Sequence, residues 1–377
     1  MSRPGRAARR FFAQLDGALI ASALALAVIG AVMVYSATRS WVVGDPGYYL
    51  RRQAINLLAG LIGLVAAVAV DYRRLLRASG VLYGLGAALL VAVLVAGRRV
   101  AGTQGWLPLG PFAVQPSELA KVALVLVLAE YLGQRKPPES WRDLVVPIGL
   151  TAGMAGLVLA QPDLGTAVVF GVILLGMLYA AQTPARYLGW MAGAAVLAAT
   201  AAVLVTYLGW FEVLKPHQIQ RLTVFVDPGA YRQGAGWNVS QSVIAIGSGK
   251  LFGRGLFSGP QTQLAFVPAR HTDFIFSVIG EELGFFGAAA VLGLFFVLIR
   301  RGLAIAAQAR DRGGALLAAG VVVMVGFHVV FNVGMTLGMV PVMGIPLPLL
   351  SYGGSHGLAT LTALGMVAGV GARRVPW

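Results

Sequence analysis

The stretch FIFSVIGEELGFFGAAAVLGLFFVLI, residues Phe274–Ile299, decides the fold class. A helix needs about 20 apolar residues to cross roughly 30 Å of hydrocarbon, and this run is long enough. It lacks the strict alternation of a strand in a membrane barrel. The stretch therefore predicts a membrane-spanning helix, with Asp273 at its mouth and Glu281 and Glu282 about two turns deeper.

The rest of the chain has the same character. Of its 377 residues, 58% are hydrophobic and 11% are charged, and the mean hydropathy is +0.79. This leaves too little polar surface to cover a water-soluble protein of that size. We expect an all-α, polytopic membrane protein, one domain over residues 1–377, with about ten transmembrane helices near residues 17–36, 53–70, 78–97, 117–133, 144–160, 164–182, 187–208, 274–299, 314–335 and 351–371.

Positive charge predicts the orientation. An even number of spans places both termini on one side, where the chain ends and loops carry seventeen Lys and Arg residues, against five in the short loops opposite. Because Lys and Arg gather on the cytoplasmic side, both termini are expected there. The net charge of +15 is then explained by flanks that face anionic membrane lipid, so no nucleic-acid partner is expected.

Several kinds of site are excluded or unsupported. The chain has no cysteine, which excludes disulfides and thiolate metal sites. Its four histidines are scattered and form no metal signature, and GSGKLFGRG lacks the spacing of a P-loop. We expect no dedicated metal site and no use of ATP through a P-loop.

The long segment of about residues 208–272 is predicted to be a large extracytoplasmic loop. Segments of this length without a role are uncommon in compact proteins. Its pattern indicates short amphipathic helices and turns, although a merely solvated loop is the alternative. Its basic residues, Arg221 among them, suit an anionic ligand such as a lipid phosphate.

A second outer element is GTQGWLPLGPFAVQPSELAKV, Gly102–Val122. Its prolines end helical structure, and Ser117 is expected to cap the next helix with Glu118 in its first turn. Glu118 and Lys121 share one helix face and should point inward, either as a structural ion pair or toward a polar cavity. From its position alone, Trp106 is expected to be a residue of the interfacial aromatic belt.

A third outer element is NVGMTLGMVPVMGIPLPLLSYGGSHGLA, Asn332–Ala359. Its prolines and the Gly353–Gly354 pair force irregular backbone near the membrane boundary. Such backbone is tolerated only when it is buried in protein or lines water, so a cavity is expected here.

These stretches together carry a resemblance. QPSELAK, QPDLGTA, GWNVSQSVIAIGSGKLFGRG, HTDFIFSVIGEELGFFG and GIPLPLLSYGGS resemble, in order, the signature stretches of the SEDS family, the RodA, FtsW and SpoVE proteins of bacterial cell-wall synthesis. The resemblance implies a peptidoglycan glycosyltransferase that polymerises lipid II at the outer membrane face beside a class B penicillin-binding protein. The short termini favour a RodA-like member.

Site residues follow from the same resemblance. It implies that Asp273 is catalytic and that Trp106, Glu118, Lys121, Arg221 and Ser351 bind substrate. Two positions depart from the family pattern. Gly105 stands where an arginine often precedes the tryptophan, with Arg98 or Arg99 as candidate substitutes. Lys250 stands where glycine is common.

The implied chemistry gives Asp273 a purpose. A sugar 4-hydroxyl attacks the anomeric carbon of an α-linked diphosphate donor, and undecaprenyl diphosphate leaves with inversion. This needs a base, which contributes roughly 10²–10⁴-fold to a rate, and positive charge from Lys, Arg or a divalent cation such as Mg²⁺ or Mn²⁺. The alternative role for Asp273 is a helix N-cap.

Glu281, Glu282 and the activity itself each allow a second interpretation. The two glutamates point about 100° apart on a helix, so at most one of them shares a cavity with Asp273; a structural pair with a basic residue is the alternative to catalysis. A lipid II flippase or other transporter, and a scaffold for a penicillin-binding protein, are the rival functions.

Overall fold

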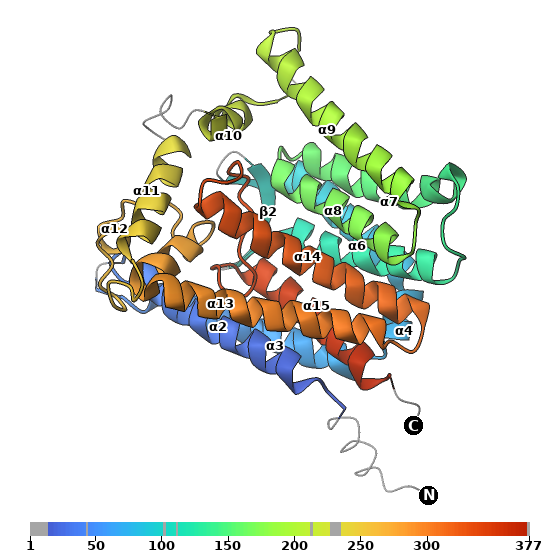
Figure 1. The fold of residues 1–377 in the computed structure, drawn as a ribbon, viewed down its shortest axis with the longest axis horizontal. Helices are drawn as coiled ribbons and strands as arrows, with labels where there is room; N and C mark the ends of the chain where they lie inside the picture. The colour runs from blue at the N-terminus through green and yellow to red at the C-terminus, as the bar shows by residue number, and fades with distance from the viewer. Residues whose placement is uncertain are drawn as a thin grey trace, which may run out of the picture.

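The computed structural model is a bundle of long helices (Figure 1). It describes residues 14–42, 44–100, 103–110, 112–211, 214–226 and 235–374. All ten predicted spans are helices, so the expected all-α, polytopic fold is confirmed. They are α2 (Gly17–Thr38), α3 (Tyr48–Ala69), α5 (Ser79–Ala96), α6 (Pro116–Gly133), α7 (Trp141–Leu159), α8 (Leu164–Ala180), α9 (Ala185–Tyr207), α13 (Ile275–Ala307), α14 (Arg312–Thr336) and α15 (Gly354–Ala372).

Eight of these helices are long and apolar enough to cross a membrane. The other two are special cases: α8 has 17 residues, and α6 carries Glu118, Lys121 and Glu130 within 18. The ten helices also differ in how much of each is buried inside the protein. In α15, 89% of the most apolar window is buried inside the protein, whereas in α9 the value is 0%. Helix α15 is therefore central, and α9 stands at the edge (Figure 1).

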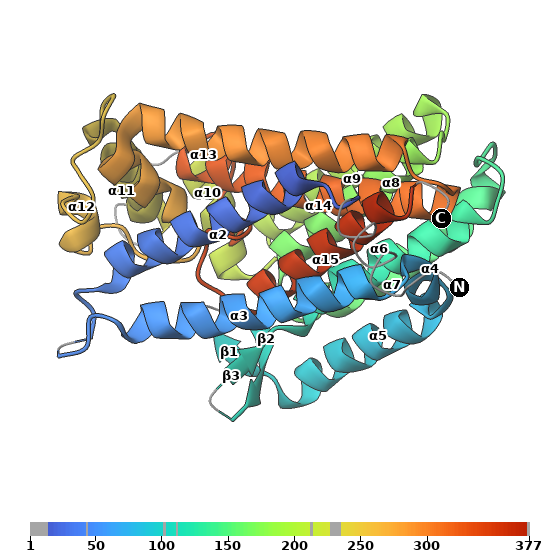
Figure 2. The same cartoon turned by 90° about the horizontal axis from the view of Figure 1, so that it is seen from below.

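The two ends of the bundle differ (Figure 2). The short helix α4 (Tyr72–Arg77) and the end of α15 lie at one end. Helices α10 (Pro216–Val226), α11 (Ala235–Ser248) and α12 (Pro260–Gln263) lie at the other, which we call the loop end. The prediction of short helices in the long loop is confirmed for its described part, since residues 212–213 and 227–234 lie outside the description.

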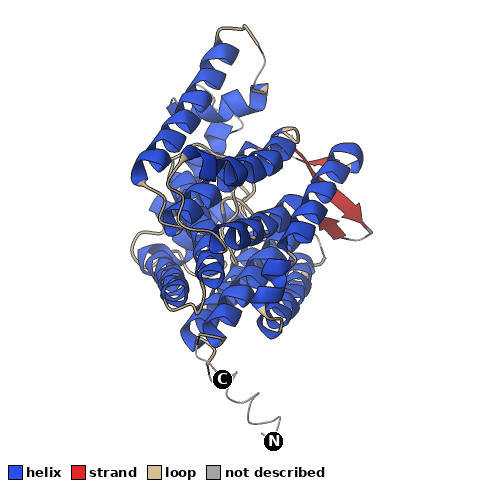
Figure 3. Ribbon diagram, turned by 90° about the vertical axis from the view of Figure 1, so that its right-hand side faces the viewer, coloured by secondary structure: helices blue, strands red, loops and turns tan. Residues whose placement is uncertain are grey.

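A small antiparallel sheet at the edge of the bundle was not predicted (Figure 3). It comprises β1 (Arg98–Val100), β2 (Thr103–Leu109) and β3 (Phe112–Val114), in the order β1-β2-β3. The Gln104 backbone N–H donates to the Gln161 carbonyl at 3.3 Å, and the Gln104 side chain donates to the carbonyls of Val93 and Leu94 at 3.2 Å. The sheet is thereby fixed to the end of α5.

The start of α6 corrects one prediction. The N-cap position is Gln115, which makes no side-chain cap, and Pro116 opens the helix. Proline is favoured there because the first helical N–H has no intrahelical partner to lose. Ser117 lies inside the first turn, and its buried hydroxyl has no hydrogen-bond partner among the described residues, so the prediction that Ser117 caps the helix was wrong.

Helix α13 is interrupted at Gly284, where φ is 66° and ψ is −164°. The break exposes backbone groups that pair with the glycine-rich turn after α11. Arg254 N–H donates to the Glu281 carbonyl at 2.9 Å, and Phe285 N–H donates to the Lys250 carbonyl at 2.9 Å. A Cβ on Gly253 or Gly284 would overlap the opposing backbone. Glycine is therefore required on both sides of this seam.

Glu281 and Glu282 hold the same loop in place. Glu281 accepts hydrogen bonds from the backbone N–H groups of Gln261 and Thr262 at 2.7 and 2.9 Å. Glu282 accepts from the Phe257 backbone at 3.1 Å and from the Ser36 hydroxyl. The predicted alternative of an ion pair with a basic residue was wrong, because the carboxylates bind backbone amides and hydroxyls of this chain instead. Neither glutamate lines the pocket that contains Asp273.

Candidate active site

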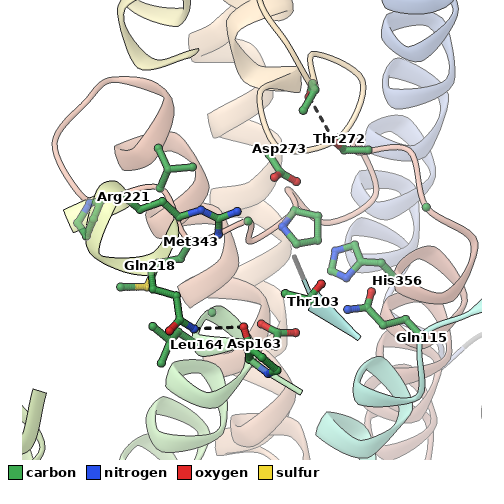
Figure 4. Close-up of a pocket in the computed structure, with 18 of the residues that line it drawn as sticks. Thr103, Gln115, Asp163, Leu164, Gln218, Arg221, Thr272, Asp273, Met343 and His356 are labelled. Carbon is green, nitrogen blue, oxygen red and sulfur yellow. Dashed lines mark hydrogen bonds between the residues drawn. The ribbon is translucent and has the colours of Figure 1, made fainter. Parts of the chain in front are cut away.

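The loop end contains a pocket of about 300 Å³. It lies between β2, the start of α8, α10 and the segments that precede α13 and α15. Figure 4 shows Arg221 and Gln218 reaching in from one side, His356 and Gln115 from the other, and Asp273 above them. The cavity expected beside the proline-rich segment is therefore present, because Pro341 and Pro346 line it.

The backbone around Asp273 is fixed by side chains from other elements. The Asn332 amide of α14 donates to the Asp273 carbonyl at 2.8 Å and to the Ile345 carbonyl at 2.7 Å. The Ser351 hydroxyl donates to the Thr272 carbonyl at 2.7 Å. The N-cap position of α13 is Phe274, with no side-chain cap, so the N-cap interpretation of Asp273 was wrong.

The Asp273 carboxylate faces a cation across Gly344. A Cβ built on Gly344 would lie 3.5 Å from Oδ2 of Asp273 and 4.0 Å from Nη1 of Arg221. Gly344 has a φ of 68°, a backbone conformation that suits glycine, so the turn brings no side chain between the two groups. Burial raises the pKa of Asp273 above its usual 3.8, and the Arg221 charge opposes that shift.

The other expected site residues divide into two groups. Trp106 lines the pocket from β2. Ser351 is buried and does not line the pocket; its hydroxyl accepts from the Leu347 N–H at 2.8 Å and supports the backbone before Asp273. Arg98 is exposed and outside the pocket lining, so it does not replace the arginine absent at Gly105. The Arg99 side chain lies outside the described residues.

Glu118 and Lys121 face inward, as predicted, beneath the pocket. Lys121 Nζ lies 2.9 Å from Glu118 Oε1 and 3.0 Å from His328 Nε2. His356 Nδ1 lies 2.8 Å from Glu118 Oε2. All four side chains are buried, and of them only His356 also lines the pocket with Asp273. Glu118 and Lys121 thus adjoin the pocket through His356 instead of lining it themselves.

Comparison with known proteins identifies the family. The sequence model of the FtsW/RodA/SpoVE family, described as "Cell cycle protein", matches residues 17–374. The chain belongs to this family. It is 37% identical over 350 residues to "Peptidoglycan glycosyltransferase MrdB" of Escherichia coli K12, covering 93% of each chain. It is 39% identical over 364 residues to "Probable peptidoglycan glycosyltransferase FtsW" of Alkalilimnicola ehrlichii, covering 94% of this chain and 88% of that one.

Solved structures agree with the family assignment. A chain from the structure titled "Structural coordination of polymerization and crosslinking by a peptidoglycan synthase complex" matches with a TM-score of 0.80 and 35% identity, over 96% of this chain and 98% of that one. The rod shape determining protein RodA of Thermus thermophilus matches with a TM-score of 0.70 and 34% identity, again over 96% and 98%. The FtsW/RodA/SpoVE fold thus spans nearly the whole chain.

Several pocket residues of this FtsW/RodA/SpoVE-family chain escaped the sequence analysis. Asp163 caps α8 by accepting from the Thr166 N–H at 3.0 Å, and it also borders the pocket. The sequence feature that could have indicated it is the short polar stretch QPD between two apolar spans. Gln218 lies in α10 and His356 in the first turn of α15, and neither residue stood out in the sequence. Their contribution depends on tertiary contacts.

Arg270 fixes the backbone just before Asp273 to the end of α2. It is 1% exposed, its Nε donates to the Ala37 carbonyl at 2.8 Å, and its guanidinium lies over the Trp41 ring at 4.8 Å. Burial lowers the pKa of Arg270 to about 10, so it remains charged at neutral pH. The residue anchors the chain just before Asp273 without lining the pocket.

Proposed function

We propose that this chain polymerises lipid II with Asp273 as the general base. The chain is a peptidoglycan glycosyltransferase, the activity for which its curated relatives are named. The observation that supports Asp273 is its position: its backbone carbonyl accepts a hydrogen bond from Asn332, and its carboxylate faces Arg221 across Gly344 at the pocket wall. A base and a cation on either side of one space suit a reaction that takes a proton and releases a diphosphate.

The reaction can be written as a single displacement. The sugar 4-hydroxyl oxygen forms a bond to the anomeric carbon of the donor, and its proton passes to the Asp273 carboxylate. The carbon–oxygen bond to the diphosphate breaks at the same time, and the electron pair leaves with the undecaprenyl diphosphate. Inversion then converts the α-linked donor into a β-1,4 link, and no covalent enzyme intermediate is required.

A divalent cation fits this pocket as a companion of the substrate. Among the described residues, no three His, Asp or Glu side chains are grouped to hold a metal ion. The lining does contain two carboxylates, Asp163 and Asp273. Mg²⁺ binds through one or two carboxylates together with substrate phosphates, so these residues would hold an ion that neutralises the diphosphate.

The orientation follows from charge. We place the loop end, with the pocket, on the outer face of the bacterial inner membrane and both termini in the cytoplasm, because the terminal side carries seventeen Lys and Arg residues, against five in the short loops opposite. Lipid II presented at the outer face would then reach the pocket directly.

Thiol labelling tests this orientation, and the chain contains no cysteine of its own. Ser258 and Lys136 are exposed, in the loop between α11 and α12 and between α6 and α7. A membrane-impermeant maleimide should label Ser258→Cys in intact cells, and Lys136→Cys only after the membrane is opened. Labelling with the opposite pattern would reverse the proposed orientation.

The proposed partner is a single-span class B penicillin-binding protein. The similar structure is titled as a synthase complex that couples polymerization with crosslinking, which supports a cross-linking partner for this chain. Polymerisation should therefore be measured on the purified chain with and without that partner, using labelled lipid II and Mg²⁺ or Mn²⁺.

Glycan ladders on a gel are the expected result, with a complex recovered from detergent after co-expression. A flippase predicts lipid II movement without polymer under either condition. A scaffold predicts no polymer unless the partner itself makes it. Absence of polymer with both proteins present would therefore contradict the proposed function.

A further inference from the structure

The first turn of α15 places a histidine between the pocket and the buried ion pair. His356 is 7% exposed and lines the same pocket as Asp273. Its Nδ1 lies 2.8 Å from Glu118 Oε2, whereas its Nε2 is buried with no hydrogen-bond partner among the described residues. Figure 4 shows the ring directed toward the space below Asp273. A buried nitrogen without a partner is costly, which points to a ligand in the pocket.

Glu118 determines which ring nitrogen of His356 is left without a partner at the pocket. An ionised carboxylate only accepts hydrogen bonds, so Nδ1 of His356 must carry a proton and donate it. The remaining nitrogen, Nε2, is then the atom left to bind a ligand in the pocket. A carboxylate on Nδ1 also stabilises the ring when Nε2 gains a proton. Glu118 is thus a positioning residue that fixes the tautomer and orientation of His356.

The buried cluster has no spare charge of its own. His328 Nδ1 lies 2.7 Å from the Met324 carbonyl and therefore donates to it, so His328 Nε2 accepts from Lys121. Lys121 is then a charged donor whose charge balances that of Glu118, and His328 is neutral. A proton on His356 would leave one net positive charge facing the pocket, and an anionic ligand would offset it.

The pocket needs such a charge for its proposed substrate. Its lining contains two carboxylates, Asp163 and Asp273, and one arginine, Arg221. A divalent cation on the two carboxylates would balance their charge, and Arg221 would then be the single cationic side chain of the described lining to meet two negatively charged phosphate groups. Charge-assisted hydrogen bonds are the strongest that a side chain can offer to a phosphate oxygen.

We propose that His356 binds the diphosphate of the lipid carrier through Nε2, taking up one proton from water as the ligand enters. This rests on the proposed function, since it assigns a role within the same pocket. The imidazolium then donates to a diphosphate oxygen and stabilises the charge that develops as the glycosidic carbon–oxygen bond breaks. His356 and Asp273 would act on opposite partners of the reaction, the leaving group and the attacking hydroxyl.

The titratable and charged groups around His356 come from every neighbouring element. They are Glu118 and Lys121 of α6, His328 of α14, Tyr352 before α15, Asp163 at the start of α8, Arg221 of α10 and Asp273 before α13. All of these neighbouring side chains are still present when His356 alone is replaced. Comparing two variants at each pH therefore isolates the contribution of His356 from that of the pocket and the ligand.

The decisive variant is His356→Asn. The asparagine amide replaces Nδ1 and can still donate to Glu118, while Nε2 is lost. Full-length protein in lipid nanodiscs would be titrated with undecaprenyl diphosphate, and with neutral undecaprenol as control, between pH 6.0 and 8.5. We expect His356→Asn to weaken diphosphate binding roughly 10–100-fold at the lower pH, with undecaprenol binding unchanged. The wild-type advantage should shrink as pH rises.

A second variant separates binding from structure. In His356→Gln the amide can reach the position of Nε2 but does not titrate, so diphosphate binding should be partly kept and the wild-type pH dependence lost. A purely structural His356 predicts instead that Asn binds like the wild type at every pH. Equal diphosphate affinity of wild type and His356→Asn, with matched melting temperatures, would overturn the proposal.

Failure of the proposed base is distinguishable from failure of this inference. Asp273→Asn removes turnover but should bind undecaprenyl diphosphate at least as well as the wild type, because a negative charge has left the pocket. If Asp273→Asn polymerised normally, the base assignment would fail while the diphosphate titration still decided the role of His356.

Discussion

Replacing Asp273 with asparagine should lower glycan polymerisation by about two orders of magnitude or more. Asparagine has nearly the same size but cannot accept the proton of the attacking hydroxyl. The fold should survive, because the carboxylate does not cap α13 and the Asp273 carbonyl remains bound to Asn332. The measurement is the initial rate of polymer formation from labelled lipid II.

Stability and pH dependence provide two further readouts of the same variant. Burial raises the pKa of Asp273, so the folded state holds its proton to higher pH than the unfolded chain does. The ionised side chain therefore costs stability at neutral pH, and Asp273→Asn should melt no lower than the wild type. The base must be ionised to accept a proton. As the pH is lowered, the wild-type rate should therefore begin to fall at a pH above 3.8, the usual pKa of an aspartate.

Asp45→Asn is the matched control for this substitution. It makes the same chemical change at an outer ion pair with Arg51, away from the pocket, and should leave polymerisation unchanged. If Asp273→Asn polymerised lipid II at the wild-type rate, Asp273 would not be the general base. Equal losses in both variants would mean that the assay responds to net charge.

Gly284→Ala should destabilise the protein by about 3 kcal/mol or more. At φ 66° and ψ −164° the backbone is in a region open almost only to glycine. A Cβ would also overlap the backbone nitrogen of Gly253 and lie 2.8 Å from the Leu251 carbonyl oxygen. Backbone atoms cannot rotate away, so the seam between α13 and the glycine-rich turn must open. The readouts are the melting temperature in detergent and the folded yield.

Gly293→Ala on the same helix is the control. Gly293 is exposed, and a Cβ there meets nothing within 4 Å. In a helix interior, glycine is less stable than alanine by roughly 0.5–1 kcal/mol, so this variant should be neutral or slightly stabilising. Similar melting temperatures for the two alanine variants would show that the seam contributes little to folding.

The helices could be predicted because the membrane leaves few choices. Within hydrocarbon every backbone group must be paired internally, so apolar runs of sufficient length become helices. Even α6 and α8, one charged and one short, were predicted from windowed hydropathy. The β1-β2-β3 sheet was missed because its prolines and glycines obscure strand alternation, and because its pairing is supported by Gln104 contacts with α5.

The candidate site was predictable only where one residue carried its own signal. Asp273 stood out as an acid at the mouth of an apolar helix. Ser351 carried a motif but supports backbone instead of lining the pocket. His356 was overlooked because its role depends on Glu118, which lies far away in the sequence. Contacts of that kind are properties of packing and cannot be derived from spacing.

Lys250 illustrates a departure that the structure explains. It has a φ of 50°, in the left-handed region, where a side chain is disfavoured and glycine is free. The preference for glycine at this position thus reflects backbone geometry instead of a lost binding group. The lysine is held there by the Phe285 N–H, which donates to its carbonyl.

The two sides of the pocket are held by different parts of the fold. Asp273 is held by Asn332, a side chain of the buried helix α14, whereas Arg221 belongs to α10, which follows α9, a helix with none of its apolar window buried. Segments with few buried contacts move at lower free-energy cost than the core. A processive polymerase must shift its product by one unit after each addition. If this chain is processive, we expect the α10 wall to move during that step, while the Asn332 contact keeps the backbone of the base in place for the next round.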